Sequence, residues 1–142
     1  MTTPPPTSTT TDRATSDSLL GTSFAASLTV NDLQKSLAWY RDVVGFTVDR
    51  QHERDGKLMA VSLRAGDVRL LIGQDDGAKG VNRVKGEGFS LQITTTQSID
   101  ELAAGVKGRG GTIESGPADM PWGARMFRLR DPDGFRITVS SS

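Results

Sequence analysis

The sequence predicts an α+β fold made of two tandem βαβββ modules, because its second half repeats its first. Residues 63–72 and 129–139 both begin with Leu-Arg, turn through Gly and Asp, and leave in an Arg-apolar-X-apolar strand. Upstream, Phe24 and Phe89 each open a strand that precedes a helix ending at glycine. A repeat of about 65 residues is too long for a solenoid unit and indicates two copies of one larger module.

The first module can be followed element by element. Residues 24–30 alternate apolar and small polar side chains, as in a half-buried strand. Asn31 and Asp32 are good helix N-caps, and Gly45 is a good helix end. Between them runs one apolar stripe at helical spacing: Leu33, Leu37, Tyr40 and Val44. Three strands complete the module, at residues 46–54, 57–64 and 68–72.

The second module repeats this order. A strand opens at Phe89, and residues 98–101 have the form of a capping box that begins a helix. The apolar stripe of this helix is Ile99, Leu102, Ala103 and Val106. We expect a short strand at 112–114, a loop at 116–120, and strands at 122–130 and 135–140 on either side of the turn 131–134.

The first strand of each module has one face that suits a ligand cavity better than a core. That face carries Ala25, Ser27 and Thr29 in the first module and Ser90, Gln92 and Thr94 in the second. These side chains are small and mostly polar, while the alternate positions are apolar and need a helix to cover them. Two curved sheets whose polar faces are turned toward one another would enclose a ligand-binding cleft.

The first 22 residues differ in composition from the rest. They are rich in Thr, Ser and Pro and contain no apolar stretch of the kind found in a signal peptide. Such a segment buries too little apolar surface to offset its ordering entropy. We therefore expect a disordered leader at 1–22 and one domain at 23–142, with modules at 23–73 and 88–141 and an exposed linker at 74–87.

Composition excludes several classes of function. Lys plus Arg and Asp plus Glu number 17 each, so no basic excess indicates a nucleic-acid partner. No apolar run approaches the roughly 18 residues that a bilayer span requires. The absence of cysteine rules out disulfides, thiolate metal sites and a cysteine nucleophile. We expect a cytoplasmic protein with neither a membrane nor a nucleic-acid partner.

Two sets of motifs resemble a known family. The segments VNDL at 30–33, SLAWY at 36–40 and VGF at 44–46 resemble the N-terminal signature of the vicinal oxygen chelate superfamily. That group contains glyoxalase I, bleomycin-resistance proteins and extradiol dioxygenases. PWG at 121–123, Arg125, Phe127 and DPDG at 131–134 resemble its C-terminal signature, in the form common among bleomycin-resistance-like members. The resemblance implies paired βαβββ modules, usually assembled as dimers.

The resemblance also implies where a metal would be held. Metal-dependent members place His, Gln or Glu at four strand positions that correspond here to Ala25, Leu71, Ser90 and Thr138. None of these side chains supplies an imidazole or carboxylate donor. The single histidine, His52, is expected on a mid-module strand away from all four. The resemblance therefore predicts no metal site, no cofactor and no catalytic residue.

The candidate ligand-binding residues are Trp122, Arg125, Phe127, Ser27, Thr29, Gln92 and Thr138. Trp122, in a Pro- and Gly-flanked loop, would be either a stacking platform or a loop anchor. Arg125 alternates with Phe127 on one strand face and would meet either an anionic ligand or solvent. Trp39 and Tyr40 are expected between helix and sheet, and His52 on the surface.

The leading prediction is a metal-independent small-molecule-binding protein, a homodimer that sequesters an aromatic compound or an antibiotic. One alternative is a metal-dependent lyase, isomerase or dioxygenase of the same superfamily that uses atypical ligands. Another is an accessory protein whose cleft is vestigial. The residues do not identify the ligand.

Overall fold

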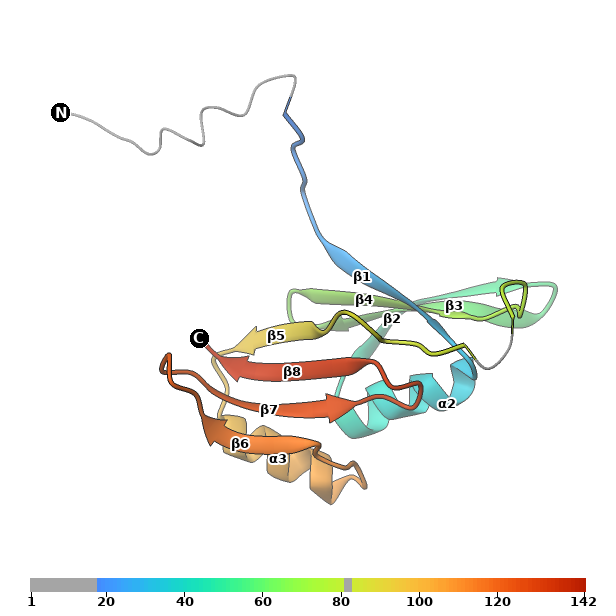
Figure 1. Ribbon diagram of the computed structural model, residues 1–142. Coiled ribbons are helices and arrows are strands. Elements are labelled where there is room, and N and C mark those ends of the chain that lie inside the picture. Colours follow the sequence, from blue (N-terminus) through green and yellow to red (C-terminus); the bar gives the residue numbers. More distant parts are fainter. Residues whose placement is uncertain (1–17, 81–82) are drawn as a thin grey trace.

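The structure is a computed structural model that describes residues 18–80 and 83–142, and these form two four-stranded sheets (Figure 1). The first sheet has the order β1 (Ala25–Val30), β4 (Val68–Gln74), β3 (Lys57–Ala65), β2 (Thr47–Arg54). The second has the order β5 (Leu91–Thr95), β8 (Arg136–Ser141), β7 (Arg125–Arg130), β6 (Ser115–Asp119). In each sheet the first pair is parallel and the others are antiparallel. The predicted α+β fold is confirmed.

The helices begin where the capping signals indicated. Helix α2 (Leu33–Ala38) starts after Asp32, whose side chain accepts a hydrogen bond from the Lys35 amide at 3.2 Å. Helix α3 (Ile99–Gly108) starts after Ser98, which accepts in the same way from Glu101. None of the helices in the described part of the chain is long and apolar enough to cross a bilayer.

The first helix changes its winding halfway along. After Ala38 the chain continues as the π-helix η1 (Trp39–Val44) and ends at Gly45, whose φ of 110° is in the left-handed region. A π-helix places more residues in each turn than an α-helix. The predicted apolar stripe therefore rotates around the helix axis relative to the sheet. As a result, Tyr40 is fully buried while Val44 is only half-buried.

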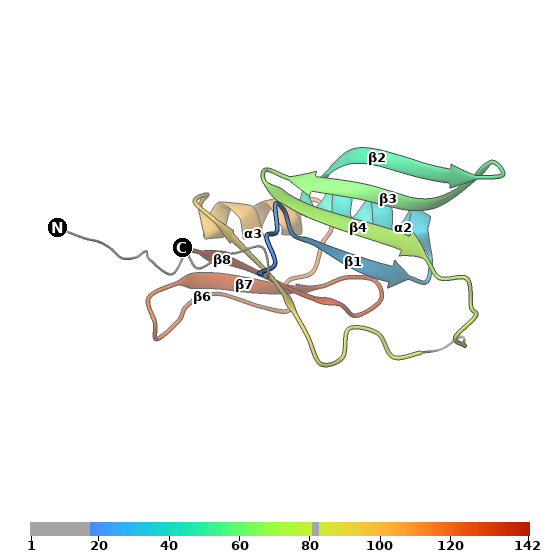
Figure 2. The ribbon, with the colours of Figure 1, turned by 90° about the horizontal axis from the view of Figure 1, so that it is seen from above.

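The core lies between each sheet and the helix that covers it. Figure 2 shows α2 behind the first sheet, and Figure 1 shows α3 behind the second. The largest fully buried side chains come from both modules: Tyr40, Leu63, Ile72, Phe127, Leu129 and Ile137. Trp39 is half-buried and packs edge-on against Tyr40, with ring centroids 4.8 Å apart. The expected placement of both aromatic residues is confirmed.

Several predicted boundaries are wrong in the second module. Strand β6 occupies Ser115–Asp119, where we expected a loop, and no strand forms at 112–114. Pairing with β7 prevails over the Gly-Pro composition, since an edge strand tolerates a bulge and a proline. Strand β7 starts late, at Arg125, because residues 120–124 form a hairpin turn in which the Met120 amide donates to the Ala124 carbonyl at 2.7 Å.

Both phenylalanines expected to open the first strands lie just before them. Phe24 is 92% exposed and Phe89 is 45% exposed, so neither belongs to the core. The remaining positions of β1 behave as expected, with Leu28 and Val30 buried on the helix side. Residues 1–17 of the expected disordered leader lie outside the described residues, and residues 18–22 are exposed.

We call the side of each sheet that is turned away from its helix the open face. In Figure 1 the open face of the first sheet points upward, whereas the other sheet turns its open face toward the viewer. The small polar face expected on β1 and β5 is therefore present in both modules. The expectation that the two faces oppose one another is wrong for a single chain, because the covering helices pack inward between the modules.

Candidate functional site

The predicted site residues of β1 line a cavity at the junction of the modules. This linker cavity has a volume of about 610 Å³ and lies between the linker and β1, the edge strand of the first sheet. Its principal lining residues are Ser27, Thr29, Gln74, Lys85, Phe89 and Phe135. The rings of Phe89 and Phe135 lie 5.7 Å apart between centroids, which gives the cavity one aromatic wall. Strand β1 contributes the side chains of Ser27 and Thr29, and the linker contributes charged residues such as Asp75 and Lys85.

A buried ion pair holds the linker over this cavity. The Lys85 ammonium donates to Asp75 Oδ2 at 2.7 Å and to the Thr29 carbonyl at 3.1 Å, and its side chain is only 6% exposed. The Arg83 guanidinium donates to the same carboxylate at 2.9 Å. The hydrogen bond from Lys85 lowers the pKa of Asp75 well below its usual range, with help from the Gly77 amide and Arg83. Asp75 is thus ionised at neutral pH. The linker segment around Lys85, which forms the roof of the cavity, is anchored to β1.

Close backbone packing fixes the far end of the roof. Gly86 has a φ of 75°, and a Cβ on it would lie 2.8 Å from both the Gly134 carbonyl oxygen and the Phe135 Cα. Only glycine therefore permits this approach of the linker to the turn at 131–134. No local pattern predicts this contact, since the linker has the composition of an ordinary exposed Gly- and Asp-rich segment.

Gln92 and Thr138, the predicted site residues of the second module, come together on the open face of the second sheet. Gln92 on β5 is the register partner of Thr138 on β8, and Thr138 is in turn the partner of Arg128 on β7. The Thr138 side chain is buried, and Gln92 is exposed. Neither residue lines the linker cavity, so the structure does not place them with Ser27 and Thr29.

Arg125 and Phe127 share a strand face as predicted, but that face is turned toward α3. Phe127 is 2% exposed and belongs to the core. Arg125 donates to Asp100 at 2.9 Å and to Asp119 at 3.0 Å, and its pKa is raised mainly by the hydrogen bond to Asp100. The structure thus separates both residues from the open face that carries Thr138. Phe127 instead borders a second cavity of about 630 Å³ on the helix side, between the modules.

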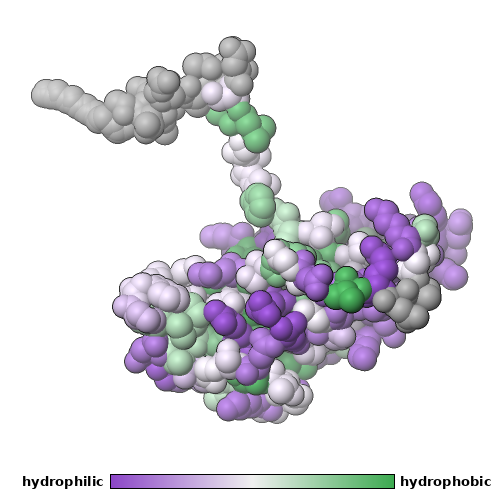
Figure 3. Space-filling model, in the orientation of Figure 1, coloured by the Kyte–Doolittle hydropathy of each residue, from purple (hydrophilic) through white to green (hydrophobic). Residues whose placement is uncertain are grey.

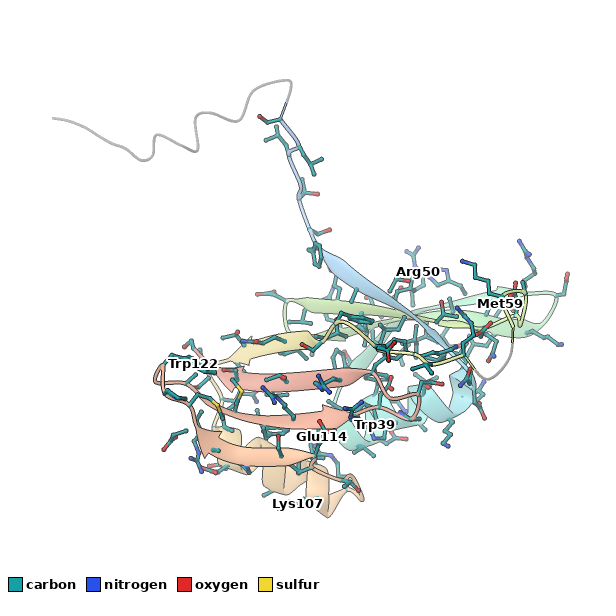
Figure 4. All side chains as sticks on the ribbon, viewed as in Figure 1. Trp39, Arg50, Met59, Lys107, Glu114 and Trp122 are labelled. Atoms are coloured by element: carbon teal, nitrogen blue, oxygen red, sulfur yellow. The ribbon has the colours of Figure 1, made fainter. Side chains whose placement is uncertain are left out.

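Trp122 lies at the tip of the β6–β7 hairpin (Figure 4). Its side chain is 69% exposed, so it is not a core anchor. The length of β7, roughly 17 Å for a strand of this size, separates it from the turn at 131–134. Trp122 therefore does not meet the linker cavity of its own chain.

The four positions that correspond to metal ligands carry no suitable donors. In each module these positions lie on or next to the strands that come first and last along the chain: Ala25 on β1, Leu71 on β4, Ser90 just before β5, and Thr138 on β8. His52 is exposed on β2. Across residues 18–80 and 83–142, no group of three or more His, Cys, Asp or Glu side chains is arranged to hold a metal ion. These residues do not fit a divalent metal.

Comparisons with known proteins agree with this architecture. The family model described as Glyoxalase/Bleomycin resistance protein/Dioxygenase superfamily matches residues 22–139. No curated protein is significantly similar in sequence. A solved member of that superfamily from Sphaerobacter thermophilus DSM 20745 is 24% identical, with 87% of this chain and 98% of that chain covered and a TM-score of 0.69.

Two further solved structures share the fold. TnmS3, an antibiotic binding protein from Streptomyces sp. CB03234, is 22% identical, with 86% of this chain and 96% of that chain covered and a TM-score of 0.67. TioX from Micromonospora sp. ML1 is 20% identical, with coverages of 84% and 94% and a TM-score of 0.65.

Proposed function

The chain belongs to the Glyoxalase/Bleomycin resistance protein/Dioxygenase superfamily, and from this premise we propose that it binds an aromatic small molecule without using a metal. The observation that carries the proposal is the linker cavity. Its volume of about 610 Å³ falls within the range of small-molecule sites. The Phe89–Phe135 pair offers a stacking surface, and the hydroxyls of Ser27 and Thr29, which also line the cavity, offer hydrogen bonds.

The similarity in fold to an antibiotic binding protein supports an antibiotic as one such ligand. Sequestration needs only a cavity that buries the ligand, so no catalytic group is required. The composition, which lacks cysteine, is compatible with a reducing compartment, and we propose that the protein acts in the cytoplasm.

Alanine at Phe89 is expected to weaken binding of a neutral aromatic probe such as 2-naphthol about fivefold to tenfold, because stacking on one aromatic ring contributes on the order of 1 kcal/mol beyond area burial. Since Phe89 is already 45% exposed, the melting temperature should change little. Isothermal titration calorimetry measures the affinity, and a thermal melt measures the stability.

Phe24→Ala is the matched control. Phe24 precedes β1 as Phe89 precedes β5, but it is 92% exposed and does not line the cavity. The control should bind 2-naphthol as the unmodified protein does. Equal affinity of all three proteins, or no saturable binding by any of them, would remove the linker cavity as the site.

A metal-dependent lyase, isomerase or dioxygenase remains the alternative, and metal analysis separates the two. We expect the protein purified without chelator to hold far less than one equivalent of Zn, Ni, Fe or Mn, and EDTA to leave its melting temperature unchanged. The reason is that Ala25, Leu71, Ser90 and Thr138 supply no imidazole or carboxylate. A stoichiometric metal whose removal lowers the melting temperature would favour the enzyme.

We further propose a homodimer, because the open face of each sheet lacks a covering element within the described chain. Light scattering should then give about twice the chain mass of 15.2 kDa. In such a dimer Trp122 would reach the ligand from the second copy.

Trp122→Ala is expected to lower the affinity for 2-naphthol about fivefold to tenfold while lowering the unfolding free energy by less than about 1 kcal/mol. The small stability effect follows from the 69% exposure of this side chain. A fluorescence titration and a denaturant melt measure the two quantities. Unchanged affinity per folded molecule would place Trp122 outside the site.

A further inference from the structure

The open face of the second sheet carries an unusual concentration of arginine. Arg128 and Arg130 on β7 and Arg136 on β8 lie on this face, as the register Arg128↔Thr138 and Arg130↔Arg136 shows. Figure 3 views this face directly and shows hydrophilic side chains gathered over its middle. The whole chain has no net charge, so this cluster is a local excess of positive charge.

Among the described residues, Glu114 is the carboxylate that pairs with this arginine cluster. Glu114 accepts a hydrogen bond from Arg130 Nε, and Arg136 Nε lies 3.9 Å from its other oxygen. Figure 4 shows Glu114 beside β7 on the viewer's side of the sheet. The hydrogen bond from Arg130 is the main reason why the pKa of Glu114 is lowered, so the group is ionised at neutral pH. Three guanidinium groups facing one carboxylate leave an unbalanced positive charge.

The pairing of two arginines across neighbouring strands does not favour the sheet. Like charges directly opposite one another on neighbouring strands are destabilising, and Arg130 and Arg136 are such a pair. Their side chains are 45% and 43% exposed, so they retain donors that an incoming anion could use. The first sheet repeats the motif: Arg64 faces Arg69, and both lie near Asp49, at 3.9 and 3.4 Å.

A buried hydroxyl lies in the middle of the cluster. Thr138 is 5% exposed, and its side chain makes no hydrogen bond to any of the residues that the structure describes. Buried polar groups in folded proteins normally have a partner. Thr138 is flanked across the strands by Arg128 on one side and by the Gln92 amide on the other. The unused hydroxyl and the unbalanced guanidinium groups therefore share one region of the same face.

We propose that this face is an oxyanion-binding site in which Arg128, Arg136 and Thr138 hold the acidic group of an organic ligand. Guanidinium groups bind carboxylate, sulfate and phosphate through paired, charge-assisted hydrogen bonds. Arg130 is committed to Glu114 and to the Gly134 carbonyl at 3.2 Å, which leaves Arg128 and Arg136 for the anion. The site is separate from the linker cavity and does not depend on the function proposed for it.

A matched pair of probes tests the site. The carboxylate 2-naphthoate should bind about tenfold more tightly, or better, than its isosteric neutral amide, 2-naphthamide, in low salt, and sulfate should compete with it. Arg128→Gln combined with Arg136→Gln should remove this preference for the acid. Arg41→Gln, an exposed arginine paired only with Asp42 among the described residues, is the control and should leave it unchanged. Calorimetry gives each dissociation constant.

Thr138→Val separates binding from folding. Because the hydroxyl has no partner among the described residues, its removal should leave the melting temperature unchanged or raise it, while the affinity for 2-naphthoate falls several-fold. Equal affinity for the acid and the amide would overturn the proposal, and so would a preference that survives the double arginine variant. Binding of sulfate but not of 2-naphthoate would retain the oxyanion site and overturn the organic ligand. Phe89→Ala should leave the competition between sulfate and 2-naphthoate unchanged.

Discussion

Replacing Phe127 by alanine is expected to lower the free energy of unfolding by about 3 to 5 kcal/mol, the usual cost of deleting a buried aromatic ring. Phe127 is 2% exposed and packs in the core between the second sheet and α3. The ring already borders a cavity on the helix side of the sheet, so its loss would enlarge an existing void rather than let the core collapse. A urea melt at constant m-value measures the change.

The comparison with Trp122→Ala makes this result specific. Trp122 is the larger side chain and belongs to the same C-terminal motif, yet it is 69% exposed and should cost less than about 1 kcal/mol. Conversely, Phe127→Ala should not alter the affinity for 2-naphthol per folded molecule. A small stability loss for Phe127→Ala, together with weakened binding, would mean that the ring faces a ligand instead of the core.

The contrast between Phe127 and Trp122 shows what a sequence pattern can predict about a strand and what it cannot. The alternation along β7 correctly indicates that Arg125 and Phe127 share one side of the strand. It does not indicate which side meets the helix, because Met126 on the opposite side is apolar and buried as well. That choice depends on how β7 pairs with β8 and on where α3 packs, both of which are long-range contacts.

Local signals correctly predict the helices and most of the strands. Asp32 and Ser98 cap their helices because a side-chain oxygen three residues upstream of an amide satisfies it without any tertiary contact. Edge strand β6 has no such signal, since Gly116 and Pro117 favour a turn and only pairing with β7 makes them a strand. Local sequence patterns do not predict the linker cavity either. Its roof depends on the Lys85–Asp75 ion pair and on the close backbone approach beside the turn at 131–134, which are contacts between distant parts of the chain.

A second large effect is expected at Asp131, which links the two modules. Its Oδ2 accepts a hydrogen bond from the Tyr40 hydroxyl at 2.7 Å, and its Oδ1 accepts from the amides of Phe135 at 2.8 Å and Asp133 at 2.9 Å. Asp131→Ala should therefore cost roughly 3 kcal/mol, about 1 for each hydrogen bond. Asp131→Asn retains an acceptor oxygen for the amides and should cost less.

Burial raises the pKa of Asp131 above its usual range, although the three donors act in the opposite direction. A carboxyl whose pKa is higher in the folded state than its unfolded value of about 3.9 binds more protons when folded. The stability that this provides is complete below the unfolded pKa and is lost as the pH rises through the folded pKa. The difference in unfolding free energy between the unmodified protein and Asp131→Asn should therefore shrink as the pH rises above about 4.

Denaturant melts of both proteins at a series of pH values measure this difference, and two further variants determine its origin. Tyr40→Phe removes the one donor to Asp131 that comes from the first module and should cost about 1 kcal/mol. Part of that cost should be absent when Asp131 has already been replaced by alanine. Asp42→Ala, an exposed carboxylate paired with Arg41 on the surface, is the control and should have little effect. If Asp131→Ala costs no more than this control, the Tyr40–Asp131 hydrogen bond does not hold the modules together. A difference that grows with rising pH would mean that Asp131 is stabilised as the carboxylate.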